Sequence, residues 1–391
     1  MRIGIYGGTF NPPHAGHVHA AEEAGRVLNL DKLLIIPDNL PPHKELPEGS
    51  PTNAQRLEMA KLAFGSIPCA EISDMELCRE GKSYSVDTVR QVHEQYPDAE
   101  LWLLMGSDML KILHLWHEPE TILRLAKVGT FSRGDAGEDA MFSEMIPLLR
   151  SNFKAEVVRI PIAPMKAASS EIRHALEMSG MTDLLPAPVL GYIQREHLYG
   201  TATDLKRLTP EQLRPIALSY LKHRRMRHVL GTEEEAVRLA RRYGADETQA
   251  RIAALLHDCT KKLNLSEQMA LCARYDVALD DMERTTLKLL HAKTGAAVAQ
   301  HVFGVQAAVS EAIKWHTTGK ADMSLLEKVI YLADYIEPSR DFPGVDALRR
   351  KVYDNLDAGL AMGLEMTIEE MHELGEPVHP KTLEALQFLK G

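Results

Sequence analysis

Residues 1–25, MRIGIYGGTFNPPHAGHVHAAEEAG, set the architecture of the first half of the chain. The apolar, β-branched run RIGIYG predicts a buried strand, and the run VHAAEEAGRVLNL predicts a helix. Glycines, prolines and histidines fill the junction between them, where a simple connection would need only a turn. The composition of this junction predicts that it holds a ligand.

The residue types in the junction favour an anion. Gly7 and Gly8 let the backbone approach a phosphate, and the helix that follows presents unpaired N–H groups. His14 and His17 lie three residues apart on one face of the first helical turn, where two imidazole donors would bind phosphate oxygens. The loop has neither a Walker A lysine nor a dinucleotide fingerprint. A tight strand–helix turn with two incidental surface histidines would produce the same local pattern.

Up to about residue 200, strand-like and helical stretches alternate, which predicts an α/β fold with a parallel sheet covered by helices on both faces. Ligands of such sheets bind at the carboxyl ends of the strands, where the opening loop lies. From "TPEQLRPIALSYLKHRR" onwards nearly every segment has helical spacing. We therefore expect two domains, residues 1–203 and an all-α domain over residues 204–391.

The bulk composition narrows the classes of function. No apolar run is long enough to span a membrane, and the four cysteines form no C-x-x-C pair, so we expect a cytoplasmic protein with reduced thiols. The net charge of −10 argues against stable binding of nucleic acid, although a small basic pocket for a phosphorylated metabolite remains compatible with it. A homo-oligomer is also compatible with the sequence.

The second half contains histidines and aspartates in an ordered series, H-x28-HD-x32-H-x24-H-x17-D. In a helical domain these side chains could converge on one centre, and mixed imidazole and carboxylate ligands suit iron, manganese or another divalent transition metal. Any one of these histidines could equally be an ordinary hydrogen-bonded residue. The six candidate ligands are His228, His257, Asp258, His291, His316 and Asp334.

The string GGTFNPPHAGH resembles the signature of the nucleotidylyltransferase superfamily, and AASSEIRHAL at residues 167–176 resembles its second motif. The resemblance implies a Rossmann-like domain that joins a nucleoside triphosphate to a phosphorylated acceptor and releases pyrophosphate. It also implies that Ser169 and Ser170 cap a helix and that Arg173 reaches the triphosphate. Ala168 stands where the superfamily usually has a further serine.

Four further stretches, NLPPHK, KSYSVDT, LLMGSDMLKILHLW and FSRGD, resemble the nicotinate-nucleotide adenylyltransferases. By that resemblance Trp116 stacks on the pyridine ring, Tyr84 and Ser85 meet its carboxylate, and Asp108 holds the nucleotide. Lys44 and Arg133 would lie near the phosphates of ATP and of the acceptor. The remaining implied substrate contacts are Gly7, Gly8, Thr9, Phe10 and Gly106. Magnesium would arrive with ATP.

The stretch LLHDCTK resembles the HD phosphohydrolases. More narrowly, residues 215–370 resemble the bacterial HD family that cleaves diadenosine tetraphosphate into two ADP. The family core would be His228, His257, Asp258 and Asp334. His291 and His316 suggest a second metal, so that a bridging hydroxide would attack the phosphate. Lys261 and Arg340 would contact substrate phosphates.

Together the two resemblances imply a bifunctional enzyme. It would adenylate nicotinate mononucleotide with ATP and would hydrolyse diadenosine tetraphosphate at a centre of two transition metals, iron or manganese. Two alternatives remain for the second half. It could sense nucleotides without turnover, or it could hydrolyse another nucleotide such as a deoxynucleoside triphosphate.

Overall fold

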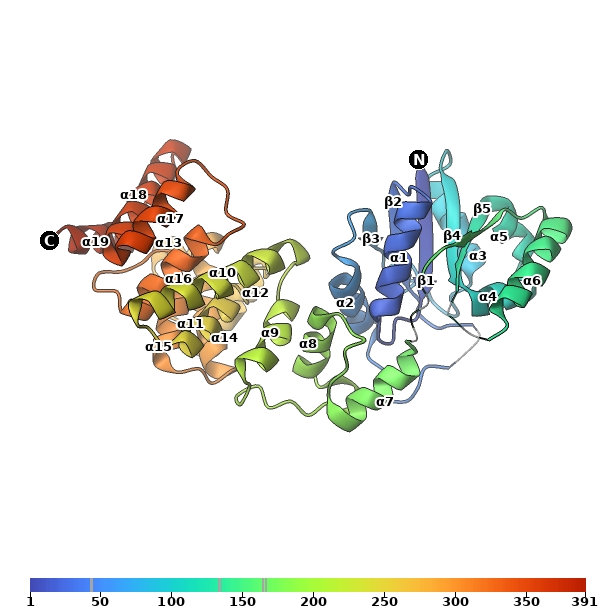
Figure 1. Cartoon of the computed structure of the whole chain (residues 1–391), viewed down its shortest axis with the longest axis horizontal. Helices are drawn as coiled ribbons and strands as arrows, with labels where there is room; N and C mark the ends of the chain where they lie inside the picture. The colour runs from blue at the N-terminus through green and yellow to red at the C-terminus, as the bar shows by residue number, and fades with distance from the viewer. Residues whose placement is uncertain (43–44, 133, 135, 164, 166) are drawn as a thin grey trace. The chain divides into compact units, whose positions relative to one another are not determined.

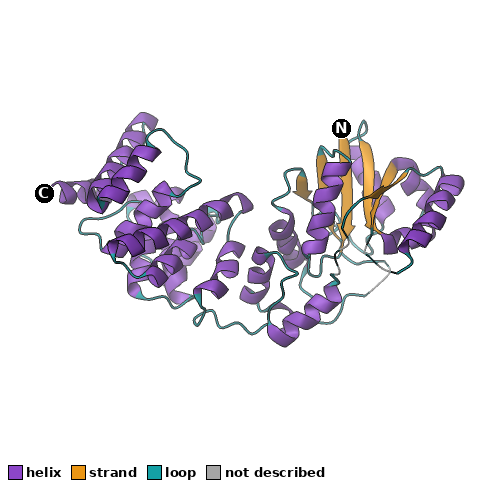
Figure 2. Ribbon diagram, viewed as in Figure 1, coloured by secondary structure: helices purple, strands orange, loops and turns teal. Residues whose placement is uncertain are grey.

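The computed structural model describes residues 1–391 except 43–44, 133, 135, 164 and 166. The chain forms two compact units, residues 1–203 and residues 204–391. The first unit carries a parallel sheet flanked by helices, and the second is built from helices (Figure 2). This confirms the predicted fold class. No helix of the described chain is long and apolar enough to cross a membrane.

The sheet of the first unit places the loop after its central strand at a ligand-binding position. The strands are β1 (Arg2–Gly8), β2 (Lys32–Pro37), β3 (Ala70–Ile72), β4 (Glu100–Gly106), β5 (Ala126–Phe131) and β6 (Val157–Ile160). Their order is β3-β2-β1-β4-β5-β6, and every pair is parallel. The order reverses between β1 and β4, so that the loops after these strands diverge and leave a crevice.

Helices cover both faces of this sheet (Figure 1). The helices of this unit are α1 (Ala15–Val27), α2 (Asn53–Phe64), α3 (Ser85–Gln95), α4 (Ser107–Ile112), α5 (Pro119–Leu125), α6 (Glu138–Phe153), α7 (Ser169–Ser179) and α8 (Ala187–Arg195), with 3₁₀ turns η1 (Leu113–Leu115) and η2 (Leu198–Gly200). Of these, α7 and α8 do not lie on a face of the sheet (Figure 1). On one face Ile3 and Ile5 of β1 belong to a core with Val89 of α3. On the other face a Cβ on Gly4 would meet the terminal methyl groups of Leu30 at 2.6 Å and Leu33 at 2.8 Å, so a larger residue there would require these side chains to shift.

The second unit is a bundle of amphipathic helices. They are α9 (Pro210–Ser219), α10 (His223–Tyr243), α11 (Glu247–Leu256), α12 (Leu265–Tyr275), α13 (Asp281–Thr285), α14 (Leu287–His301), α15 (Ala307–Lys314), α16 (Leu325–Ile336), α17 (Val345–Asp354), α18 (Leu356–Leu374) and α19 (Pro380–Lys390). In α10 the buried Met226, Val229, Ala236 and Ala240 recur at helical spacing. Capping boxes such as that of Ser324 define where helices begin. The bundle thus brings α10, α11, α14, α15 and α16 around one centre (Figure 1).

Candidate functional sites

A cavity of about 530 Å³ opens in the first unit at the carboxyl ends of β1 and β4. Its wall combines the β1–α1 loop, the start of α3, the β4–α4 junction and the residues around Trp116. The structure therefore brings together most of the residues that the sequence placed at a nucleotide site. Those that line the cavity are Gly7, Gly8, Thr9, Phe10, His14, His17, Tyr84, Ser85, Gly106, Asp108, Trp116 and Ser169.

Two stacked histidines mark the point where α1 begins. His14 is the N-cap residue of α1, and its ring lies 3.7 Å, centroid to centroid, from the ring of His17. The backbone N–H of His14 donates to Nδ1 of His17 at 3.2 Å. Because Nδ1 accepts this proton, the ring proton of neutral His17 must sit on Nε2. His17 can therefore donate a hydrogen bond to an oxyanion in the cavity.

A buried arginine, Arg56, supports the same loop, and the sequence patterns did not indicate this role. Arg56 on α2 is fully buried and donates to the Thr9 carbonyl oxygen at 2.9 Å and to the Asp38 carbonyl oxygen at 2.7 Å. Asp38 in turn accepts from the Thr9 hydroxyl at 2.8 Å. The available signal was an arginine on the apolar stripe of α2, one helical turn before the buried Met59.

Tyr84 and Trp116 add aromatic side chains to the cavity wall. Tyr84 is the N-cap residue of α3, and its ring centroid lies 4.8 Å from that of His117, beside Trp116. The Glu138 carboxylate accepts hydrogen bonds from the hydroxyls of Ser107 and Ser132. These bonds tie the loops after β4 and β5 together, so Glu138 is a second supporting residue that the sequence patterns did not indicate.

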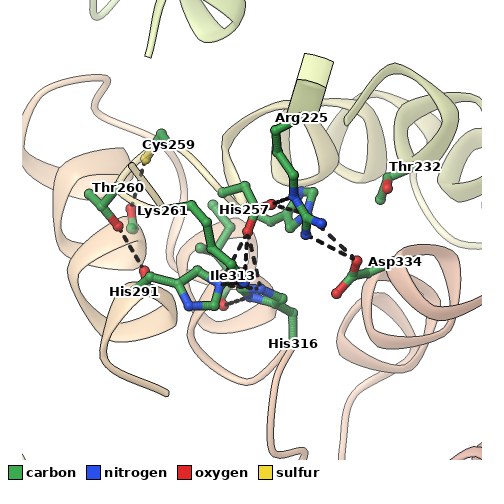
Figure 3. A network of polar contacts seen from close by, with 12 residues as sticks. Arg225, Thr232, His257, Cys259, Thr260, Lys261, His291, Ile313, His316 and Asp334 are labelled. Atoms are coloured by element: carbon green, nitrogen blue, oxygen red, sulfur yellow. Dashed lines mark hydrogen bonds and ion pairs between the residues drawn. The ribbon is translucent and has the colours of Figure 1, made fainter. Parts of the chain in front are cut away.

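In the second unit, the six predicted ligands come from five segments and meet at one centre. Figure 3 labels His257, His291, His316 and Asp334 among them. The donor atoms of His228, His257 and Asp334 lie within 4.8 Å of one another, as do those of His257, Asp258 and His316. His291 joins them, because its Nε2 lies 3.1 Å from Oδ1 of Asp258 and 3.1 Å from Nε2 of His316.

Hydrogen bonds to Nδ1 aim the imidazoles at this centre. Nδ1 of His257 donates to the Ala254 carbonyl oxygen, and Nδ1 of His316 donates to the Ile313 carbonyl oxygen, each at 2.6 Å. A carbonyl oxygen can only accept, so the proton of each neutral ring sits on Nδ1 and the Nε2 lone pair points inward. These rings therefore present the form that binds metals.

A buried carboxylate orients a third imidazole. Oε1 of Glu337 lies 2.9 Å from Nδ1 of His228, and Glu337 itself accepts from the hydroxyl and backbone N–H of Ser339. Glu337 is 1% exposed. The approach depends on Gly231 of α10, because a Cβ there would meet Oε2 of Glu337 at 2.5 Å. The sequence match included this glutamate without assigning it a role.

Family models match both units. A cytidylyltransferase-like model matches residues 5–175, and an HD domain model matches residues 225–339. The probable nicotinate-nucleotide adenylyltransferase of Listeria monocytogenes serotype 4b is 33% identical over 199 residues, which are 51% of this chain and 97% of that protein. That of Shewanella woodyi is 36% identical over 216 residues and is covered completely. The chain belongs to the nicotinate-nucleotide adenylyltransferase family.

Solved structures also resemble each half. A predicted HD superfamily hydrolase involved in NAD metabolism from Clostridium acetobutylicum is 39% identical, with a TM-score of 0.45, and the match covers 47% of this chain and 97% of that one. The nicotinic acid mononucleotide adenylyltransferase of Plasmodium falciparum is 17% identical, with a TM-score of 0.41, and the match covers 51% of this chain and 98% of that one. The adenylyltransferase family membership and the additional HD domain rest on the sequence matches.

The donor set of the HD domain fits a transition metal. Burial lowers the pKa of His257, His291 and His316 to about 4, so all three are neutral at pH 7. Burial alone would raise the pKa of Asp258 and Asp334, but the surrounding imidazoles and cations hold both pKa values well below the usual range. Nε2 of His257 is buried without a hydrogen-bond partner among the described residues, and Oδ1 of Asp258 faces Nε2 of His291 at 3.1 Å. Such atoms suit a bound cation.

Three cationic side chains lie beside this centre, Arg225, Lys261 and Arg340, and Figure 3 labels the first two. Arg225, which the sequence analysis missed, pairs with Asp258 and lies 3.9 Å from Oδ1 of Asp334. Arg340 donates to the same Oδ1 at 2.7 Å, and Nζ of Lys261 lies 3.1 Å from Nε2 of His291. Lys261 and Arg340 thus lie beside His291 and Asp334, two of the predicted ligands, and their contacts to substrate phosphates stay a prediction.

One expectation for the adenylyltransferase unit is wrong, and others lie outside the described part. Ser169 and Ser170 do not cap α7, because they lie inside its first turn and Ala168 is the N-cap residue. Ser169 instead donates to the Pro12 carbonyl oxygen at 3.2 Å. Arg173 donates to the Asn11 carbonyl oxygen at 2.7 Å and lines a neighbouring hollow. Lys44 and Arg133 lie outside the described residues.

A second cluster of histidine and carboxylates in the HD unit has a different character. Nε2 of His379 lies 3.0 Å from Oδ2 of Asp280 and 3.9 Å from Oε1 of Glu283. Nδ1 of His379 accepts from the backbone N–H of Lys381 at 3.1 Å. The proton of the neutral ring therefore sits on Nε2 and is donated to Asp280. This cluster joins α19 to α13 and presents no free imidazole lone pair to a metal.

Proposed function

We propose that the first unit transfers AMP from ATP to nicotinate mononucleotide, giving deamido-NAD and pyrophosphate. The observation that carries this proposal is the cavity at the β1–β4 crevice, which joins the phosphate-binding loop to the aromatic end at Trp116. Its dimensions suit a mononucleotide beside a triphosphate. Family relatives covered over 97% of their length support the same substrates.

The proposed reaction needs positioning and charge neutralisation from the protein. The 5′-phosphate of nicotinate mononucleotide attacks the α-phosphorus of ATP, a new P–O bond forms, and pyrophosphate leaves with the bonding electrons. His17 donates from Nε2 to a phosphoryl oxygen as negative charge develops, and the start of α1 adds its N–H groups. Trp116 and Tyr84 hold the pyridine, and Mg²⁺ accompanies ATP.

We further propose that the HD unit hydrolyses diadenosine tetraphosphate symmetrically to two ADP. The convergent donors of His228, His257, Asp258, His291, His316 and Asp334 support a dinuclear centre. Six donors exceed the four that one tetrahedral ion takes, and the two carboxylate oxygens of Asp258 face different imidazoles, Oδ2 that of His257 and Oδ1 that of His291. Bound iron or manganese would lower the pKa of a water ligand and neutralise charge on the attacked phosphate. Arg225, Lys261 and Arg340 are placed to hold the remaining phosphates.

A product assay on the purified full-length chain tests both proposals. One tube contains ATP, Mg²⁺ and nicotinate mononucleotide, and the other contains diadenosine tetraphosphate with Fe²⁺ or Mn²⁺. We expect deamido-NAD with pyrophosphate in the first and ADP alone in the second. ATP with AMP would contradict symmetrical cleavage. Binding without turnover would identify a regulatory module, and turnover of deoxynucleoside triphosphates alone would identify another nucleotide hydrolase.

A further inference from the structure

A tyrosine near the end of the first unit adopts an unusual backbone conformation. Tyr199 lies in the short turn η2, with φ of 54°, and His197 just before it has φ of 53°. Side chains other than glycine rarely occupy this left-handed region, and such conformations persist where the surrounding structure enforces them. A contact of Tyr199 with the rest of the unit must therefore hold the turn in this conformation.

The hydroxyl of Tyr199 reaches back across the sequence to the opening loop. It donates to Oδ1 of Asn11 at 2.6 Å, and Nδ2 of the same amide donates to Oγ of Ser50 at 2.9 Å. Asn11 is 4% exposed. Burial raises the pKa of the Tyr199 phenol, so its hydroxyl remains a donor at physiological pH. Both ends of the Asn11 amide are therefore held by residues distant in sequence.

Asn11 lies at the point where the loop turns towards its histidines. Phe10 just before it has φ of 45°, another left-handed residue, and His14 three positions later is the N-cap residue of α1. Arg56 holds the Thr9 carbonyl oxygen on one side of this point. Arg173 holds the Asn11 carbonyl oxygen, and the Asn11 side-chain amide adds a further fixed point on the side of the histidines. Rotation of this amide would shift the path of the chain into α1.

We propose that Tyr199 is a positioning residue for adenylyl transfer. Through the Asn11 amide it holds the β1–α1 loop so that His14 and His17 meet the reacting phosphates in a productive geometry. Tyr199 is not part of the wall of the cavity that contains His14 and His17, and it lines the neighbouring hollow beside Arg173. The inference rests on the adenylyl transfer proposed above and adds a residue from the opposite end of the unit.

The test is the kinetics of Tyr199→Phe in the full-length chain, because this change removes one hydroxyl and keeps the ring. We expect kcat to fall by about tenfold or more, since displacement of catalytic groups by a fraction of an ångström is costly. The KM for nicotinate mononucleotide should change less than about twofold, because Tyr199 is not part of the cavity wall that contains Trp116 and Tyr84. Tyr192→Phe is the matched control, since the buried Tyr192 has no hydroxyl hydrogen bond within the described chain.

A double-mutant cycle with Asn11→Ala separates positioning from general stability. If Tyr199 acts through Asn11, Tyr199→Phe should lower kcat no further in the Asn11→Ala background. An undiminished kcat in Tyr199→Phe, or the same additional loss in both backgrounds, would overturn the inference. Should Tyr199→Phe fail to fold, Asn11→Ala and Ser50→Ala carry the test, and normal kcat in both would overturn it. Wild-type protein without adenylation would instead remove the proposed function.

Discussion

The two candidate sites use histidine in opposite ways, and the backbone atom facing Nδ1 makes the difference. In the first unit Nδ1 of His17 accepts a backbone N–H at 3.2 Å, so Nε2 carries the proton. In the HD unit Nδ1 of His257 and His316 donates to carbonyl oxygens at 2.6 Å, so Nε2 carries a lone pair. The same side chain thus presents a hydrogen-bond donor in one site and a lone pair in the other.

The largest expected effect comes from removing two adjacent ligands. The double change His257→Ala and Asp258→Ala should abolish hydrolysis of diadenosine tetraphosphate and strongly lower bound metal, because it deletes donors from the buried centre. Metal content by emission spectrometry and product formation by chromatography measure the two losses. Adenylation of nicotinate mononucleotide in the same preparation is the control and should be unchanged. Retained metal together with retained hydrolysis would contradict the assignment.

His17→Ala should give the next largest effect. We expect kcat for adenylation to fall by roughly a hundredfold to a thousandfold, because a donor to the developing charge is lost. His17→Gln can place an amide N–H near the position of Nε2 and should recover part of this loss. Equal activities of the glutamine and alanine variants would mean that the Nε2 proton plays no part. Hydrolysis by the HD unit serves as the internal control.

The pKa values predict how the metal-stripped HD unit responds to acid. His257, His291 and His316 keep pKa values of about 4 when folded, whereas an unfolded histidine titrates near ~6.5. The unfolded state therefore binds more protons between these values, and the free energy of unfolding falls as pH decreases from 7 to 5, by on the order of 2 kcal/mol per histidine. His228 has a raised pKa and opposes this trend, but it is one group against three.

Calorimetry of the full-length chain at pH 7 and pH 5 checks this prediction. Added Mn²⁺ identifies the transition of the HD unit, because a ligand of the folded state raises its melting temperature. We expect that transition to move to lower temperature at pH 5 in the metal-stripped protein. A rise in its melting temperature at pH 5 would show that the imidazoles are not held neutral.

Substitution of Glu337 tests whether the residue that faces Nδ1 of His228 affects metal binding by this histidine. Glu337→Ala should weaken metal binding by about tenfold to a hundredfold, since the carboxylate that orients His228 is lost. Glu337→Gln keeps an oxygen acceptor and should bind metal more tightly than the alanine variant. Competition with a chelator measures both affinities. Wild-type affinity in Glu337→Ala would show that the orientation of His228 does not depend on this bond.

The smallest expected effect concerns His379, whose Nε2 proton is donated to Asp280. His379→Ala should lower the free energy of unfolding by about 1 to 2 kcal/mol through loss of its hydrogen bonds to Asp280 and Lys381. Metal content and both activities should stay at the wild-type level. A loss of bound metal would place an ion at this cluster. It would contradict the rule that a histidine whose Nδ1 accepts a backbone N–H does not bind metal.

Local patterns in the sequence could predict the strand–loop–helix that carries His14 and His17, because strand, turn and helix signals are short in range. The order of histidines and aspartates likewise indicated the residues that meet in the HD unit. Arg56, Glu138 and Tyr199 could not be found in this way. Each acts through a partner at least 31 residues away in sequence, at Thr9, Ser107 and Asn11, and only the packed structure defines such pairs.

The tautomers were also beyond the sequence. Whether Nδ1 of a histidine meets an N–H or a carbonyl oxygen depends on where the ring sits in its helix and on the rotamer it adopts. His17 occupies the third position of α1 and turns back to the N-cap residue. His257 and His316 follow α11 and α15 and reach carbonyl oxygens three residues earlier. The sequence shows where each histidine lies in the chain, but not which ring nitrogen carries the proton.

Gly231 has a consequence for attempts to make this protein more robust. A glycine in the middle of a long helix is an obvious candidate for replacement by alanine, which gains about 1 kcal/mol from helix propensity at ordinary positions. Here the added methyl group would occupy the space of the Glu337 carboxylate, 2.5 Å away. Thermostability screens that score folding alone could therefore select a change that displaces Glu337 from His228. In α10, the absence of a side chain at Gly231 leaves the space in which Glu337 reaches His228.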